Sequence, residues 1–343
     1  MSAKPSRQLG GTHAIWLFAF GYFACYVPYS ALTKALSKGV YPGLDEPLPG
    51  PTLLPIATLT SLAVMLAFLT ATGWWKYAHH RVIAGRSLPT PTRWTALSGL
   101  CTSAILTTTT LAYTFDGVSI VFVMLLMRGG VLILAPLVDA LTGRRTRWFS
   151  WVGLALSLAS LVVAFSEDGG YLITAACALD IAIYLAAYFV RLRFMSRLAK
   201  SDDREATLRY FVEEQLVATP ATVVLLIVAA LVGEGPWMDS IRDGFLHLPS
   251  EAFLPTVLIG ALSQGTGIFG TLVFLDKSEN TFSVPVNRSS SILAGVCASA
   301  LLAALAGVPM PSGYQLAGAG LVLLAIVALT LGPALEQRRA RSG

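Results

Sequence analysis

The stretch GVSIVFVMLLMRGGVLILAPLVDALT, residues 117–142, contains only two charged side chains, Arg128 and Asp139. It is long enough to cross the hydrocarbon core of a bilayer as one helix, which takes about 20 residues. Nine further stretches of similar character occur along the chain. The ten predicted membrane-spanning helices cover residues 13–34, 52–75, 94–115, 117–142, 148–166, 171–195, 210–232, 253–275, 280–306 and 312–334.

The composition is that of a membrane protein. Of the 343 residues, 55% are hydrophobic and 13% are charged, and the mean hydropathy is +0.67. A soluble domain has roughly 25% charged residues, so a soluble enzyme and a disordered chain are excluded. The net charge is +5, but the basic residues lie between the apolar stretches, so no nucleic-acid partner is expected. We expect an all-α integral membrane protein surrounded by the lipid bilayer.

The positions of lysine and arginine predict the orientation. With the N-terminus inside, only Lys34, Lys38 and Arg242 fall in outer segments, and two arginines lie deep within spans. The remaining 19 of the 24 basic residues lie in inner segments, which is the bias that sets topology. Both termini are therefore predicted to be cytoplasmic. The abundance of Ala, Leu and Arg indicates a GC-rich bacterial genome and hence an inner membrane.

The order and length of the spans repeat after half the chain. The starts of spans 1 to 5 recur in spans 6 to 10 after 158, 158, 159, 163 and 164 residues. This predicts two five-helix repeats, residues 1–168 and 169–343. Because five is an odd number, the two repeats insert in opposite senses. Inverted repeats are typical of secondary transporters, in which the substrate binds near the midplane between them.

Two arginines lie deep in the spans at matching positions. Arg128 is in the fourth span, and Arg288 follows 160 residues later in the ninth. An arginine at the centre of a span costs about 2.5–3.5 kcal/mol on an insertion scale, so such a residue indicates function. Guanidinium groups bind carboxylate and phosphate with two hydrogen bonds. The pair predicts a clamp for an anionic group, and a structural ion pair or a gate are the alternatives.

Two carboxylates also lie within predicted spans. Asp180 is near the middle of the sixth span, with Tyr184 on the same helical face. It is expected to neutralise an arginine, to carry a coupling proton or to contact a cationic part of the substrate. Asp139 lies near the cytoplasmic end of the fourth span and is predicted to be an inner gate or border residue.

Other polar and aromatic side chains are candidates for the substrate path. Tyr22 and Tyr26 follow each other at helical spacing in the first span, Gln264 lies among glycines in the eighth, and Asn287 precedes Arg288. They predict that polar and aromatic side chains line a cavity between the first, third, fourth, sixth, eighth and ninth spans. The alternative is close helix packing, which small and polar residues commonly support in membranes.

No motif indicates a metal, a cofactor or an enzyme. The sequence has no Walker A motif and no residues arranged as a hydrolase triad, and His79 and His80 are interpreted as solvated surface. The four cysteines lie far apart in apolar segments and are interpreted as core residues, namely Cys25, Cys101, Cys177 and Cys297.

The segment MLLMRGGVLIL (124–134), followed by LTGRR (141–145) and WVG (151–153), is similar to the hairpin of helices four and five in solute carrier family 35. The whole chain resembles the drug/metabolite transporter superfamily, in its EamA-like and nucleotide-sugar transporter-related branch. The resemblance implies alternating access through a central cavity, often with exchange of substrates. It also implies that cationic residues on helices 4 and 9 bind a phosphate-bearing substrate, and Arg128 and Arg288 hold those positions.

The sequence therefore predicts a secondary transporter for a small organic anion, phosphorylated or carboxylated, with no cofactor. A homodimer is compatible with this prediction. One alternative is a proton-coupled exporter of amino acids or amphipathic metabolites, in which Asp180 binds the arginines. The other alternative is a lipid translocator.

Overall fold

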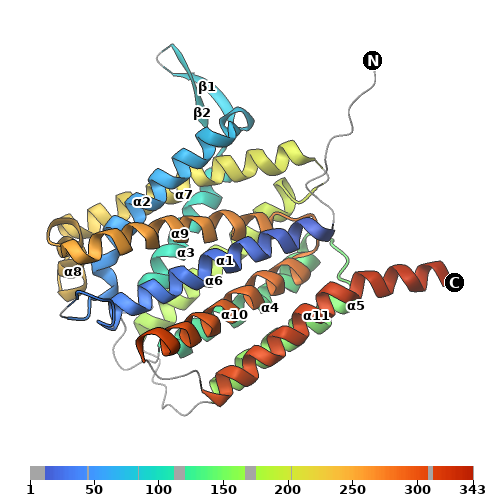
Figure 1. Cartoon of the computed structure of the whole chain (residues 1–343). Helices are drawn as coiled ribbons and strands as arrows, with labels where there is room; N and C mark the ends of the chain where they lie inside the picture. The colour runs from blue at the N-terminus through green and yellow to red at the C-terminus, as the bar shows by residue number, and fades with distance from the viewer. Residues whose placement is uncertain are drawn as a thin grey trace.

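The structure, a computed structural model, describes residues 12–44, 46–83, 85–111, 120–166, 175–201, 203–307 and 312–342, and consists mostly of helices (Figure 1). Ten helices of at least 18 residues occupy this part of the chain. They are α1 Thr12–Ser37, α2 Gly50–Thr72, α3 Arg93–Leu111, α4 Ile120–Leu141, α5 Trp148–Phe165, α6 Ala175–Leu198, α7 Arg204–Val232, α9 Ser250–Phe274, α10 Asn280–Ala306 and α11 Gly313–Ser342. The predicted boundary between the two repeats, at residues 168 and 169, lies outside the described residues.

The surface of these helices is suited to lipid. Helices α1, α2, α7, α9, α10 and α11 are long and apolar enough to cross a membrane. Large apolar side chains are exposed along them, such as Phe20 of α1 and Leu225 and Leu231 of α7. Charged side chains such as Arg191 and Glu214 are buried instead, which is the reverse of a soluble protein. The fold is that of an α-helical multi-pass membrane protein.

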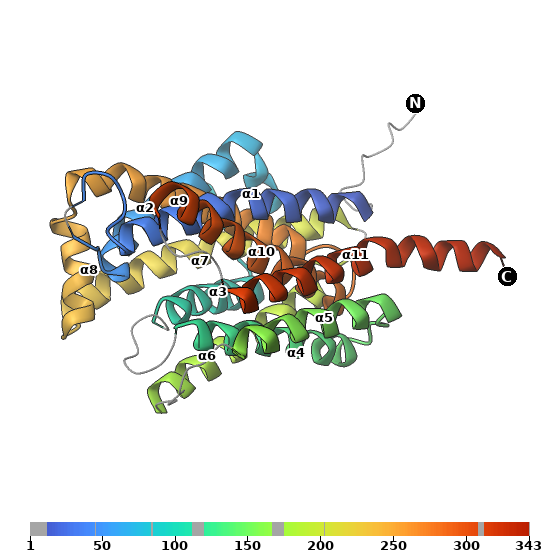
Figure 2. The ribbon, with the colours of Figure 1, turned by 60° about the horizontal axis from the view of Figure 1, so that its bottom comes forward.

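The helices pack in a pattern that brings together segments far apart in the sequence. Helix α1 packs against α9 and α10, and α6 packs against α3 and α4. Helix α2 packs against α9, and α7 packs against α3. Three further pairs join α5 with α11, α4 with α10, and α2 with α7 (Figures 1 and 2). Each of these pairs joins a helix of the first half of the chain to one of the second.

Small and polar residues allow the helices to approach closely. A Cβ atom at Gly130 of α4 would lie 2.5 Å from the side chain of Leu185, so the approach of α6 requires a glycine there. Buried Ser103 of α3 accepts a hydrogen bond from Thr222 of α7 at 3.0 Å. Ser103 therefore contributes to the packing of α3 against α7, as small polar residues commonly do in membranes.

A strand hairpin and a short helix lie where the sequence pattern predicts only loops. Strands β1 (His79–Ile83) and β2 (Arg86–Thr90) form an antiparallel hairpin that projects from the bundle beyond the short 3-10 helix η1 (Trp74–Tyr77) (Figure 1). Gly85 in its turn has φ +77°, a conformation that glycine adopts without strain. Helix α8 (Pro236–Leu246) starts with a proline, whose fixed φ suits a first helical turn.

Candidate functional site

Arg288 lies inside the bundle on α10 and is 6% exposed. Its Nη2 donates to the hydroxyl of Tyr184 on α6 at 3.5 Å, and its guanidinium lies 4.9 Å from the ring centre of Tyr188. Its Nε is buried without a hydrogen-bond acceptor. No carboxylate among the described residues forms an ion pair with Arg288, so aromatic rings and a hydroxyl surround its charge there.

Arg128 on α4 also has a tyrosine hydroxyl as a partner. Its Nη2 donates to the hydroxyl of Tyr26 on α1 at 3.0 Å. The ring of Tyr26 lies between those of Tyr22 and Tyr29, at centroid distances of 5.5 and 5.7 Å. Each arginine of the predicted clamp therefore donates to a tyrosine hydroxyl on another helix.

The two arginines belong to one cluster. The ring of Tyr26, which binds Arg128, lies 5.5 Å from that of Tyr22, and the ring of Tyr184, which binds Arg288, lies 4.8 Å from that of Tyr188. Tyr22 also lies against Gly270 beside Asn287, the residue that precedes Arg288. We call this set the arginine–tyrosine cluster and define it as Arg128, Arg288, Tyr22, Tyr26, Tyr184 and Tyr188.

Asn287 lies beside this cluster. A Cβ atom at Gly270 of α9 would lie 3.0 Å from the ring of Tyr22 and 3.3 Å from Nδ2 of Asn287. The absence of a side chain at Gly270 therefore leaves room for both residues. Gln264, also on α9, is buried, but no hydrogen bond joins it to the cluster among the described residues.

Asp180 makes no hydrogen bond to either arginine of the predicted clamp. It is 3% exposed on α6, and neither of its carboxylate oxygens has a hydrogen-bond partner among the described residues. In this structure Asp180 therefore forms an ion pair with neither arginine of the predicted clamp.

A buried ion pair links four helices and was not predicted from the sequence. Nε and Nη2 of Arg191 on α6 donate to Glu214 on α7 at 2.7 and 3.1 Å, and Nη2 also donates to Thr271 on α9 at 3.1 Å. Ser98 and Thr102 of α3 donate to the same carboxylate at 3.0 and 2.9 Å. The positive-inside pattern assigned Arg191 to an inner segment, whereas it is 4% exposed inside the bundle.

We expect Arg191→Met to lower the free energy of unfolding by about 3–5 kcal/mol, because it leaves the Glu214 carboxylate buried without its cation. The double variant Arg191→Met/Glu214→Leu should lose much less, since no charge is stranded. Denaturant unfolding of the purified protein measures both. Equal losses in the two variants would contradict this account.

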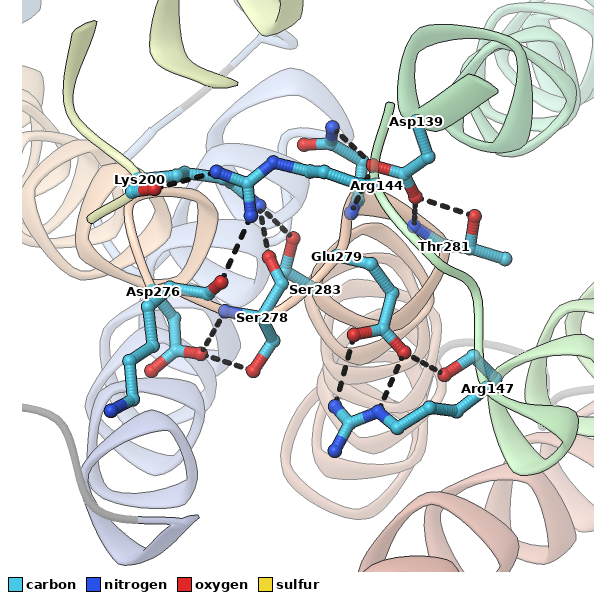
Figure 3. Close-up of polar contacts among 12 residues, drawn as sticks. Asp139, Arg144, Arg147, Lys200, Asp276, Ser278, Glu279, Thr281 and Ser283 are labelled. Atoms are coloured by element: carbon cyan, nitrogen blue, oxygen red, sulfur yellow. Dashed lines mark hydrogen bonds and ion pairs between the residues drawn. The ribbon is translucent and has the colours of Figure 1, made fainter. Parts of the chain in front are cut away.

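A second polar network joins α4 to the start of α10. Asp139 is fully buried near the end of α4, and its Oδ1 accepts from the backbone N–H and Nδ2 of Asn280, both at 2.8 Å. Its Oδ2 accepts from the backbone N–H and hydroxyl of Thr281, both at 2.7 Å (Figure 3). The carboxylate therefore caps the N-terminus of α10, where its charge is favourable.

Basic side chains of the α4–α5 loop extend this network. Arg147 donates two hydrogen bonds of 3.0 Å to Glu279, which also accepts from Ser150 at 2.6 Å (Figure 3). Arg144 donates to backbone carbonyl groups of Ser196, Lys200 and Lys277 at 3.2, 2.6 and 3.0 Å. We call the contacts of Asp139, Arg144, Arg147 and Lys200 with their partners the polar latch.

Lys200 is the lysine of the latch, and its side chain is buried. Its Nζ donates to the carbonyl of Ser278 at 3.0 Å and to the hydroxyl of Ser283 at 2.8 Å, and no carboxylate pairs with it among the described residues (Figure 3). Burial lowers the pKa of Lys200 to about 7, with Arg144 adding to the effect and Asp139, Asp276 and Glu279 opposing it.

Stability should therefore depend on pH through Lys200. An unfolded lysine has a pKa of about 10.4, so between pH 7 and 10 the unfolded state binds more protons than the folded state. Stability then rises with pH across this window, and the dependence is flat below it, where both states are protonated. We expect the melting temperature to rise from pH 7 to 9 in the wild type and to change less in Lys200→Met. An equal rise in both would exclude Lys200 as the cause.

The described residues contain no group of three His, Cys, Asp or Glu side chains that could hold a metal ion. The four cysteines, all within the described ranges, form no disulfide. His79, predicted to be solvated, has a half-exposed ring whose Nδ1 lies 2.6 Å from the buried carboxylate of Glu213, so the hairpin is tied to α7.

Comparison with known proteins yields a likeness of fold. No protein-family model matches the chain, and no curated protein matches its sequence. A solved structure, described only as the crystal structure of a protein, has a TM-score of 0.56 and 19% identity. The similarity covers 96% of this chain and 99% of that chain, so the two share their overall architecture.

Proposed function

We propose that this protein is a secondary transporter with ten membrane-spanning helices in two inverted five-helix halves, residues 1–168 and 169–343. The packing pattern supports this arrangement. The two halves correspond when α1, α2, α3, α4 and α5 are matched in order with α6, α7, α9, α10 and α11. When each helix is replaced by its match, the contacts of α1 with α9 and α10 become those of α6 with α3 and α4. The same replacement turns the packing of α2 against α9 into that of α7 against α3, and it leaves the packing of α5 against α11 unchanged.

The arginine–tyrosine cluster is the proposed substrate site, and its repetition is the observation that carries the proposal. Tyr184 follows Tyr26 by 158 residues, and Arg288 follows Arg128 by 160. Each half thus contributes an arginine that donates to a tyrosine of its own half. Arg288 is buried with no carboxylate partner among the described residues, which favours an anion as its ligand, since the anion supplies a countercharge. The proposed substrate is a small organic anion with a phosphate or carboxylate group.

The polar latch is the proposed gate at one end of the path. Asp139, Arg144 and Arg147 belong to the first half, and their partners at Ser196, Lys200 and residues 277–281 belong to the second. Rocking of one half against the other has to break these contacts to open that end. The basic character of the nearby loops supports a cytoplasmic position for the latch, with both termini on the same side of a bacterial inner membrane.

Ligand-dependent thermal stability of the purified protein tests the substrate class. The panel contains inorganic phosphate, a sugar phosphate, a nucleoside monophosphate and a dicarboxylate, with a neutral amino acid and an organic cation for comparison. A ligand present at about 100 times its Kd stabilises the folded state by about 2.7 kcal/mol. We expect a shift with at least one anion and none with the cation. A shift with the amino acid alone would favour the exporter alternative.

A further inference from the structure

Asp180 differs from every other buried carboxylate of the described residues in having no donor. Asp139 accepts four hydrogen bonds, and Glu214 accepts from Arg191, Ser98 and Thr102. Glu213 and Glu279 each accept several as well. Both oxygens of Asp180 are buried without a partner. An ionised carboxylate in such a setting is strongly disfavoured, so the neutral, protonated form is the one that fits.

Among the described residues, the helices that pack against α6 bring few charged groups near Asp180. Helix α6 packs against α3, α4 and α7. On α3 the only titratable group after Arg93 is Cys101, and on α7 the stretch 216–232 has none. Helix α4 carries Arg128 and the latch residue Asp139. On α6 itself the nearest such groups are Cys177 and Tyr184, and neither bonds to the carboxyl group.

The position of Asp180 relates it to both the site and the gate. It lies one helical turn before Tyr184, which binds Arg288. It also precedes Ser196 at the latch by 16 residues, which is about 24 Å along the helix. Asp180 therefore lies toward the end of the bundle opposite to the closed latch. Its counterpart 158 residues earlier is Tyr22, so the first half has no equivalent carboxyl group.

We propose that Asp180 is a proton-binding site that moves one proton in each transport cycle. With the latch closed, the side chain is a neutral carboxylic acid. When the latch opens, water reaches it, the O–H bond breaks, and the proton passes to water on the latch side. The carboxylate takes up a proton from water on the opposite side when the latch closes again. This inference rests on the proposed transport function, because it needs the two states of the gate.

Infrared spectroscopy of the purified protein tests the inference without any transported ligand. A protonated carboxyl group has a C=O stretching band that an ionised carboxylate lacks. The band of Asp180 is the difference between the spectra of the wild type and Asp180→Asn. We expect it in the wild type at pH 7. In Arg147→Gln, which removes the ion pair with Glu279, we expect a band at least twofold weaker at the same pH.

Two outcomes would overturn the inference. One is the absence of the band from the wild type at pH 7, and the other is an equal band in the wild type and in Arg147→Gln and Asp139→Ala. The second outcome would make the proton a permanent part of the fold. Arg147 is half-exposed, so its variant serves if Asp139→Ala does not fold. Because no ligand is used, a negative result here is distinct from the absence of any ligand shift, which would contradict the transport function itself.

Discussion

Arg288→Gln is expected to weaken binding of the transported anion by about 30-fold or more. Truncating one partner of a buried charged hydrogen bond costs about 2–5 kcal/mol, and about 1.4 kcal/mol corresponds to tenfold in affinity. Arg288→Lys keeps the charge but loses the planar fork, so its effect should be intermediate. Arg128→Gln should weaken binding to a similar extent, because the two arginines hold equivalent positions. Titration of ligand-dependent thermal stability measures all three variants.

The matched control is Arg193→Gln, since Arg193 is an exposed arginine on α6. It should leave anion binding unchanged. If Arg288→Gln and Arg128→Gln bind the anion as well as the wild type does, the cluster is not the substrate site. If both instead lower stability with no ligand present and no anion shifts the wild type, the two arginines are structural.

Asp139→Ala is expected to give the largest change in the gate. Hydrogen bonds to a charged group contribute about 1.5–3 kcal/mol each, and this carboxylate accepts four that are buried. Because such contributions are not additive and water enters the space, we expect a loss of about 3–5 kcal/mol in the free energy of unfolding. The state with the latch open should be more populated as well. Denaturant unfolding measures the first effect.

Cysteine accessibility measures the second effect, in protein whose four native cysteines are replaced by alanine. Val284 is fully buried on α10 next to the latch, so the thiol of Val284→Cys should react slowly with a membrane-impermeant maleimide. In the Asp139→Ala background it should react at least tenfold faster. The control is Asp203→Ala, which removes an exposed carboxylate that caps α7 and should cost only about 1 kcal/mol. Equal reactivity of the introduced thiol in all three backgrounds would show that Asp139 does not close the gate.

The positions of the helices could be predicted because a membrane span has a strong sequence signal. The predicted span 280–306 coincides with α10, and 148–166 differs from α5 by one residue. Predictions were poorer where a helix continues with polar residues. Helix α7 begins at Arg204 rather than at 210, because Asp203 caps it ahead of the apolar stretch by accepting a hydrogen bond from the backbone N–H of Glu205. Hydropathy alone does not reveal such a cap.

Part of the candidate site could also be predicted, because its arginines give a strong signal in the sequence. A lone arginine in an apolar span is conspicuous, and the repeat offset pairs Arg128 with Arg288. The tyrosine that each arginine binds could not be derived from spacing, since it lies on another helix. The latch depends on contacts between residues more than 50 positions apart, such as Arg144 with Ser196 and Arg147 with Glu279. The charge of the loop did not indicate these pairings, because all its basic residues fit a solvated inner surface equally well.

Counterflow in proteoliposomes tests the central claim most directly. Vesicles are loaded with the unlabelled anion that gives the largest thermal shift, and the labelled anion is added outside. We predict that the label accumulates transiently above its equilibrium level in vesicles with the wild type and not in those with Arg288→Gln. A labelled compound that is chemically altered, or no accumulation with any anion that binds, would contradict the account of this protein as a transporter.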